Sequence, residues 1–394
     1  MARKILILCW AGSAYDSLRG LLELLGQQFA AQGLGVVLFT ADGQGWPNRL
    51  AQVLGQGDIA LAVTMSGIGA DATIDGKLLW DVAKIPLFNW SCDHPCYFPR
   101  RHVIRSRYLL HGYVFPDHAR YNLDHLKPNA TTFAVHLGIP PREVFGNAPV
   151  PLSDRNGRIM FTKSGKDTNE TEAYWRTLLP EISQILFAAA EELMHRQTGD
   201  FLPVLRTIAE PRGLFFDGGS SLAMLLIQEL DAYIRFRKAN LTLRAALDFP
   251  VDVYGTGWDH IPWDGARAAY HGPLTWRGMI ERLPDYTGCL STNPLVDLSV
   301  HDRVFFALAA GVPPITDSNS FSRANMARLE PYAFAFTPER IGCAIDAVLA
   351  DPATAIARTE ETRESLAIPF GLRRAASQIV QFASMHMLNS PVEF

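Results

Sequence analysis

Short apolar runs alternate with amphipathic helical stretches along residues 1–140, and this alternation constrains the fold more than any other feature of the sequence. Lys4–Trp10 is an apolar run that ends close to Gly12, which is typical of a strand buried on both faces of a parallel sheet. Residues 17–32 then place leucines at helical spacing, and Gly33 ends the predicted helix. Strands that alternate with helices imply βαβ crossovers and a doubly wound sheet.

The same patterns predict the other elements of this first block. Strands are expected at residues 36–40, 59–64, 85–89, 113–115 and 132–136, with helices at residues 48–54 and 77–82. Residues 141–157 are rich in Pro, Gly and Asn, and they predict a linker between two domains. A strand at residues 158–162 opens the second half of the chain.

Residues 168–248 carry long helical patterns, at 174–195 and 221–247, and almost no strand signal, so they predict a helical insertion. Regular alternation then resumes. Strands are expected at residues 251–254, 288–291 and 313–316, and helices at residues 301–310, 338–349 and from 354 to about 387. A chain of 394 residues exceeds the size at which one hydrophobic core keeps growing, so two domains are expected. The predicted fold class is α/β, with two Rossmann-like doubly wound domains facing a cleft and the helical insertion in the second.

Composition excludes some classes of function. The formal net charge of −4 shows no bias towards nucleic acid. The N-terminal apolar run is too short for a signal peptide, and no run reaches the roughly 18 apolar residues of a membrane span. The five cysteines are scattered and odd in number, which suits reduced thiols in a cytoplasm. We therefore expect a cytoplasmic protein without a nucleic-acid partner or an integral membrane segment.

Open α/β sheets bind ligands beyond the carboxyl ends of their strands, so the loops there are the candidate sites. The first such loop contains Gly12 and Asp16, where a close backbone approach and a helix N-terminus suit an anionic or hydroxyl-rich ligand. An ordinary strand-to-helix turn is the alternative. The loop lacks the full G-x-G-x-x-G spacing, which disfavours a nicotinamide-dinucleotide site. His136 ends a strand near the linker and is expected close to the cleft.

Two Asp-His pairs follow strands of the first domain. Asp93-His94 and Asp117-His118 are competing candidates for a base that activates a hydroxyl group. A structural histidine is the alternative for each pair. Cys92 and Cys96 have a spacing that is not standard for zinc, so no metal site is predicted.

Three elements of the second half occur in a characteristic order. A strand at 251–254 runs into Gly-x-Gly and Trp258, and a turn at 269–272 follows it. A helix of small residues then ends at Gly311, and an apolar strand leads into Asp317. In this order and at this spacing, residues 250–320 resemble the C-terminal half of GT-B glycosyltransferases, and most of all the group of spore-maturation (CgeB-type) glycosyltransferases. The resemblance is weaker over residues 1–140 and does not cover residues 168–248.

The resemblance implies a nucleotide-sugar donor bound mainly by the second domain, residues 147–370, and an acceptor bound by the first, residues 1–146. The last helix, residues 371–394, would cross back to the first domain. Gly12, Asp16 and His136 would then lie on the acceptor side. The residues implied in donor binding are Lys163, Lys166, Tyr254, Gly255, Gly257, His271, Gly272, His301, Arg303, Phe306 and Asp317.

One residue departs from the pattern of the family. Many retaining GT-B enzymes have a glutamate, which typically holds the ribose, where this chain has Phe306. A phenylalanine cannot accept a hydrogen bond, so its ring is expected to pack against the ribose or the sugar. A core position is the alternative.

The sequence therefore predicts a glycosyltransferase that needs no metal or other cofactor. Lys163, Lys166 and Arg303 would stabilise the leaving nucleotide, because no Asp-x-Asp motif is present to hold a metal. The acceptor, whether glycan, lipid-linked or protein, is not identified. A nucleotide-sugar epimerase of the same architecture and a non-catalytic sugar-nucleotide-binding protein are the alternatives.

Overall fold

The computed structural model describes residues 4–12, 14–126, 131–146, 148–196 and 199–389. The chain forms two compact units, the first made of Met1–Gly138 with Phe370–Phe394 and the second of Ile139–Pro369. The predicted boundary after residue 146 falls beside residue 147, which lies outside the described residues. Residues 390–394, at the end of the predicted last helix, lie outside them as well.

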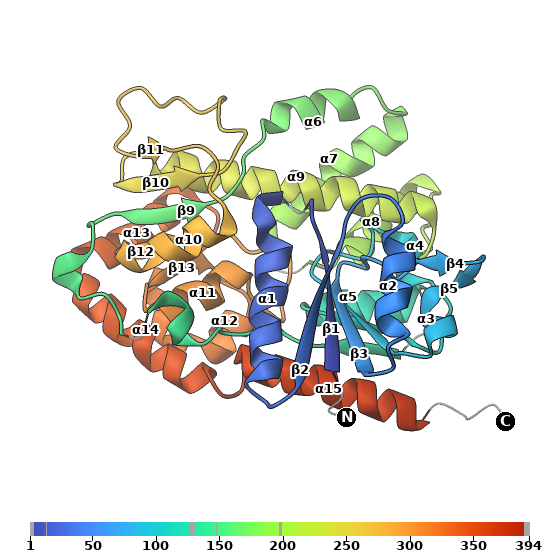
Figure 1. Cartoon of the computed structure of the whole chain (residues 1–394). Helices are drawn as coiled ribbons and strands as arrows, with labels where there is room; N and C mark the ends of the chain where they lie inside the picture. Colours follow the sequence, from blue (N-terminus) through green and yellow to red (C-terminus); the bar gives the residue numbers. More distant parts are fainter. Residues whose placement is uncertain (1–3, 13, 127–130, 147, 197–198, 390–394) are drawn as a thin grey trace. The chain divides into compact units, whose positions relative to one another are not determined.

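The first unit is built on a six-stranded sheet in the order β2-β1-β3-β6-β7-β8, in which all neighbours are parallel (Figure 1). Leu6, Ile7 and Leu8 in the centre of β1 are fully buried, as the apolar run predicted. The strands are β1 (Lys4–Trp10), β2 (Gly35–Ala41), β3 (Ile59–Met65), β6 (Leu87–Ser91), β7 (Leu109–Tyr113) and β8 (Thr131–Ala134). The helices are α1 (Ser17–Ala30), α2 (Trp46–Leu54), α3 (Leu79–Ala83), α4 (Pro99–His102), α5 (Pro116–Tyr121) and α15 (Leu372–Asn389).

Helix α15 comes from the end of the chain but belongs to this first unit. The ring of Phe382 stacks on Phe133 of β8 with centroids 4.1 Å apart, and the Ser377 hydroxyl donates to Gln32. Ile379, in the same helix, is fully buried. The first unit is thus completed by a segment that follows the whole second unit in the sequence.

The second unit contains another six-stranded parallel sheet, in the order β11-β10-β9-β12-β13-β14. Its strands are β9 (Ile159–Thr162), β10 (Val251–Tyr254), β11 (Ala269–Tyr270), β12 (Gly288–Leu290), β13 (Pro314–Asp317) and β14 (Ala333–Phe334). Helices α10 (Trp276–Arg282), α11 (Asp302–Ala310), α12 (Ser320–Asn325), α13 (Pro338–Ala350) and α14 (Pro352–Leu366), with the 3₁₀ segment η7 (Ala327–Tyr332), connect the later strands.

The predicted helical insertion is confirmed. Between β9 and β10 the described residues form α6 (Thr168–Trp175), α7 (Pro180–His195), α8 (Phe201–Ala209), the short 3₁₀ turn Glu210–Arg212 and α9 (Ser221–Ala246), and they contain no strand. The helical pattern at 174–195 is in fact two helices, because Pro180 begins a new one. The predicted tail helix is likewise interrupted between α14 and α15, where Pro369 lies.

Three local predictions were wrong for identifiable reasons. The strand expected at 113–115 is β7, which ends at Tyr113, because His111 and Gly112 break the apolar run that starts at Leu109. Residues 77–78, expected in a helix, pair with Thr73–Ile74 as a short antiparallel hairpin. Strands β11 and β14 were missed, since two residues are too few to show a period.

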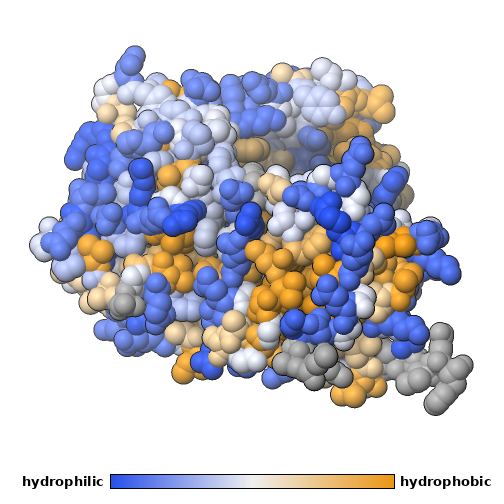
Figure 2. Space-filling model, viewed as in Figure 1, coloured by the Kyte–Doolittle hydropathy of each residue, from blue (hydrophilic) through white to orange (hydrophobic). Residues whose placement is uncertain are grey.

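Apolar side chains gather on the face of the first unit shown in Figure 2, over α1 and β2. Val36 and Leu38, on the edge strand β2, are 36% and 44% exposed. Within the described part of the chain, no helix is both long and apolar enough to cross a membrane.

Candidate functional site

Strand β9 is the point at which the strand order of the second unit's sheet reverses. From this strand the chain builds β10 and β11 on one side, and it later adds β12, β13 and β14 on the other side. Loops that leave neighbouring strands in opposite directions open a crevice at their carboxyl ends, which is where α/β sheets bind ligands. Here the loop after β9, which carries Lys163, lies close to the start of α11, which follows β12 in the chain.

Arg303 links the two sides of this switch point. Its Nη1 donates to the carbonyl oxygen of Thr162, the last residue of β9, and its Nη2 lies 3.0 Å from Nε2 of His301. Burial lowers the pKa of Arg303, and Asp302 beside it opposes that effect. The guanidinium is therefore held in place by protein groups at the crevice.

Lys163 is the second cation of this group. Its pKa falls to about 7, because burial disfavours the ammonium form and the charges of Arg303 and Arg235 add to the effect. Asp231 and Asp302 partly oppose the shift. A lysine that is half deprotonated near neutral pH gains its charge most readily when an anion comes to lie beside it.

The start of α11 carries the compensating charge. Burial opposes ionisation of Asp302, but His301 and Arg303 outweigh it and hold the carboxyl pKa well below its usual range. Burial, together with Arg303, lowers the pKa of His301 to about 4, so this ring is neutral at neutral pH. His301 also accepts a 3.4 Å hydrogen bond from the backbone N–H of Arg303 and so caps α11.

Asn293, in the loop after β12, fixes that cap. Its Oδ1 accepts from the backbone N–H of His301 at 2.7 Å, and its Nδ2 donates to the Thr316 hydroxyl and to the Asp317 carbonyl. The Asp317 carboxylate accepts from the backbone N–H of Asn293 at 2.7 Å and lies 3.5 Å from Lys238 Nζ. Asp317 is thus a buried anchor of the loop, with a pKa that burial raises against the pull of Lys238.

The glycines of the Gly-x-Gly motif allow two loops to pack closely. A Cβ at Gly255, where φ is 141°, would lie 2.3 Å from the carbonyl oxygen of Lys163. A Cβ at Gly257 would lie 2.3 Å from the carbonyl oxygen of Gly165. Trp258 completes the contact, since its Nε1 donates to the Lys163 carbonyl at 2.7 Å. These glycines therefore position the main chain that carries Lys163.

Tyr254 and His271 belong to a second network, which is centred on Asp252 of β10. His271 Nε2 lies 2.9 Å from Asp252 Oδ1, and the rings of His271 and Tyr254 stack with centroids 4.9 Å apart. Burial favours the neutral form of Asp252, but hydrogen bonds from His271, Tyr286 and Arg158 outweigh it and lower the carboxyl pKa. Gly272 follows in a left-handed turn with φ of 76°. The structure therefore places these predicted donor residues around a structural carboxylate.

Lys166 and Phe306 occupy contrasting positions. The Lys166 side chain is exposed, and its carbonyl accepts from Asn240 Nδ2 of α9 at 2.9 Å. Phe306 is 1% exposed, with its ring 6.2 Å from the rings of both Phe145 and Trp276. This burial favours the core alternative for Phe306.

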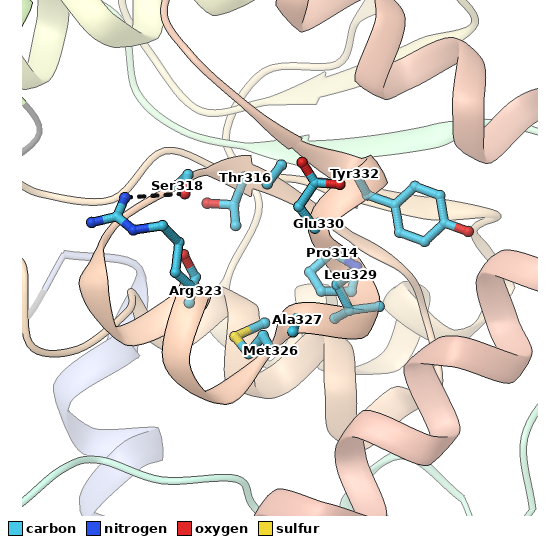
Figure 3. Close-up of a pocket in the computed structure, with 11 residues that line it drawn as sticks. Pro314, Thr316, Ser318, Arg323, Met326, Ala327, Leu329, Glu330 and Tyr332 are labelled. Atoms are coloured by element: carbon cyan, nitrogen blue, oxygen red, sulfur yellow. Dashed lines mark hydrogen bonds between the residues drawn. The ribbon is translucent and has the colours of Figure 1, made fainter.

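A separate pocket of about 330 Å³ lies between β13, α12, η7 and β14 (Figure 3). Arg323 and Ser318 lie on one side of it, with Arg323 Nη1 3.5 Å from the Ser318 hydroxyl, and Glu330 lies on the other. Thr316 lines the pocket and accepts the hydrogen bond from Asn293 described above. One residue of the pocket lining, Thr316, therefore also contacts the loop that precedes α11.

The first unit has a switch point of its own, between β1 and β3. In the loop after β1, which contains Gly12, Tyr15 and Asp16 both adopt a left-handed backbone with φ of 58°. After β3, Ser66 has φ of 52°. Left-handed residues other than glycine are costly and concentrate at functional sites, so their occurrence at these two loops favours a ligand site there. His136 lies apart from them, edge-on to the ring of Phe370 at 5.2 Å, and burial lowers its pKa.

The two candidate Asp-His pairs come together. Their strands, β6 and β7, are neighbours, and the rings of His94 and His118 meet edge-on with centroids 5.0 Å apart. Both rings are buried, at 4% and 3% exposed, and Asp93 and Asp117 are half-buried. Among the described residues, no three His, Cys, Asp or Glu side chains are grouped as metal ligands.

Comparison with solved structures identifies the architecture. The chain is similar to an alpha-glucosyltransferase in complex with UDP and a 13-mer DNA containing a HMU base, with a TM-score of 0.53 and 10% identity over 98% of this chain and 100% of that chain. It is also similar to T4 phage BGT in complex with its UDP-glucose substrate, with a TM-score of 0.50 and 8% identity over 97% and 98% of the two chains. No family model and no curated protein matches the chain. These likenesses confirm the predicted GT-B fold of two Rossmann-like domains.

Truncation of Phe306 separates its two possible roles. Phe306→Ala should lower the free energy of unfolding by about 3–5 kcal/mol, because the cavity lies among aromatic rings. Phe215→Ala is the matched control, since Phe215 is 78% exposed, and it should change stability by less than about 0.5 kcal/mol. Urea unfolding measures both variants. A small loss for Phe306→Ala together with altered donor affinity would instead show that the ring faces the ligand.

Proposed function

We propose that the protein is a glycosyltransferase that takes its sugar from a nucleotide diphosphate donor bound at the switch point of the second unit. The observation that carries the proposal is the position of Arg303, which bonds to the carbonyl of Thr162 at the end of β9 beside Lys163, with Arg235 near enough to affect the charge of Lys163. A cluster with excess positive charge beside a capped helix start suits an anion such as a diphosphate. Fold neighbours solved with UDP or UDP-glucose support this choice of ligand.

The chemistry follows from where charge develops. When the glycosidic bond of the donor breaks, the leaving nucleotide gains negative charge, and preorganised cations stabilise that charge without solvent reorganisation. Lys163 and Arg303 would serve here in place of a metal ion. Asp93-His94 and Asp117-His118 remain the candidates for the base that activates the acceptor hydroxyl, and the neighbouring rings of His94 and His118 support a shared site.

The acceptor would be a molecule that bears a hydroxyl group, and a transfer assay with several acceptors would identify its class. The candidate acceptors are a glycan, a lipid-linked molecule and a protein. One fold neighbour was solved with a DNA that contains a modified base, so DNA is a further arm of the assay.

Donor binding without added metal tests the proposal. A panel of UDP-, GDP-, ADP- and dTDP-sugars is added to the protein in excess chelator, and the melting temperature is followed. At least one sugar nucleotide should raise it, since a ligand at a hundred times its Kd adds about 2.7 kcal/mol. Addition of Mg²⁺ or Mn²⁺ should leave the shift unchanged, and transfer from that donor should also survive the chelator.

Two results would count against this proposal. If no nucleotide sugar stabilises the protein, the donor site is wrongly assigned. If donor binding or transfer is lost in chelator and returns with Mg²⁺ or Mn²⁺, the cations do not replace a metal. Turnover of the donor without any acceptor would indicate an epimerase instead.

Donor affinity should depend on the charge of Lys163. Its pKa of about 7 in the free protein means that the ammonium form is lost as the pH rises above neutrality. A bound diphosphate favours the charged form, so affinity should be highest below pH 7 and should fall by about tenfold between pH 7 and pH 9. The diphosphate of a sugar nucleotide does not titrate in this range, and calorimetry at each pH measures the affinity.

Lys163→Gln should bind the donor more weakly below pH 7 and should show little slope between pH 7 and pH 9. Lys77→Gln, at an exposed lysine of the first unit, is the control and should keep the slope of the unaltered protein. The same slope in Lys163→Gln would show that another group is responsible.

A further inference from the structure

Helix α9 of the helical insertion has an unusual charged face. Asp231, Arg235 and Lys238 are spaced four and three residues apart, so they lie on the same face of this helix of 26 residues. Asp231 and Lys238 are only 2% and 4% exposed. Burial of a charged side chain is costly, so a buried charge is normally paired with an opposite charge or serves a function.

The pairing of these residues shows where the face lies. Arg235 Nε is 2.8 Å from the buried carboxylate of Asp231. One turn further, Lys238 Nζ is 3.5 Å from Asp317, at the carboxyl end of β13, and 4.6 Å from the ring centre of Phe336. The contacts of Lys238 join α9 to the carboxyl edge of the sheet, and Arg235 lies on the same face of the helix.

A second set of contacts joins α9 to the loop after β9. Asn240 donates to the carbonyl of Lys166, and its Oδ1 lies 3.1 Å from His260 Nε2. Arg235 and Asp231 are both close enough to Lys163 to influence its charge. The same helix therefore reaches the loop that carries Lys163 and the strand end that carries Asp317.

We propose that Arg235 is a direct ligand of the donor diphosphate, and that the helical insertion is thereby a working part of the donor site. Arg235 approaches from α9, while Lys163 comes from the loop after β9 and Arg303 from the start of α11. Cations from three elements can contact different oxygens of one diphosphate, with Asp231 orienting the Arg235 guanidinium. This assignment rests on the proposed function, because it names a residue of the same site.

The helix provides its own control. Arg237 is two residues further along α9, faces away from this cluster and pairs with Glu191. Arg235→Gln and Arg237→Gln each remove one positive charge from the same helix, so long-range electrostatic effects are similar in the two variants. Because Arg235→Gln leaves Asp231 without its partner, the double variant Asp231→Asn/Arg235→Gln removes both charges of the pair.

Binding of UDP, GDP, ADP and inorganic pyrophosphate is measured by calorimetry for the unaltered protein and the three variants. For each diphosphate that binds, Arg235→Gln and the double variant should raise Kd by about tenfold to a hundredfold, the range for a charge-assisted contact. Arg237→Gln should change Kd by less than about twofold. Circular dichroism confirms that each variant is folded.

Two outcomes overturn the assignment, and they are distinguishable. If the double variant binds a diphosphate as tightly as the unaltered protein does, Arg235 is not a ligand, although the proposed function stands. If the unaltered protein binds none of the four compounds, the donor site itself is wrong, and the role of Arg235 fails with it. An equal loss of affinity in Arg237→Gln would also overturn the assignment, because the effect would then be one of net charge.

Discussion

The hydrogen bond from Arg303 to the end of β9 is the interaction on which the rest of the second unit's site depends. It holds a guanidinium close to Lys163, although two cations repel and both lose hydration when buried. Asp302 and Asp231 offset part of this repulsion. With Arg235, the cluster contains three cationic side chains and two carboxylates, and under the proposed function this excess favours an anion.

Close packing of uncharged groups and hydrogen bonds to the backbone fix the loops around these cations. Gly255 and Gly257 let the loop after β10 press against the main chain of Lys163, and Trp258 bonds to that main chain. On the other side, Asn293 joins the cap of α11 to the end of β13. Because these contacts involve backbone groups, the main chain that carries Lys163 and Arg303 is ordered during folding rather than on ligand binding.

Periodicity predicted the fold because a parallel strand covered on both faces is mostly apolar, as β1 is from Ile5 to Cys9. It could not reveal the role of α9, since Asp231, Arg235 and Lys238 lie in a helix whose other faces are also buried, and an i, i+4, i+7 spacing alone does not show what the face meets. That spacing was nevertheless the one feature of the sequence that indicated a charged face on α9. The meeting of His94 and His118 was predictable only as a consequence of adjacent strands, and β7 was misplaced because a buried histidine, His111, interrupts its apolar run.

The packing of Phe306 shows why a match to a family motif does not transfer a role residue by residue. The helix α11 keeps the small residues, the capping glycine and the arginine of the pattern, but the position of the glutamate lies between Phe145 and Trp276. A carboxylate placed there would lose its hydration, and of the two rings only Trp276, whose indole N–H is buried without a hydrogen-bond partner, could donate to it. Phe306 therefore packs in an aromatic cluster with Phe145 and Trp276, and its ring offers no hydrogen bond to a ribose. Under the proposed function, other groups would recognise the nucleoside, and the proposed diphosphate contacts of Lys163 and Arg303 would not require a glutamate at this position.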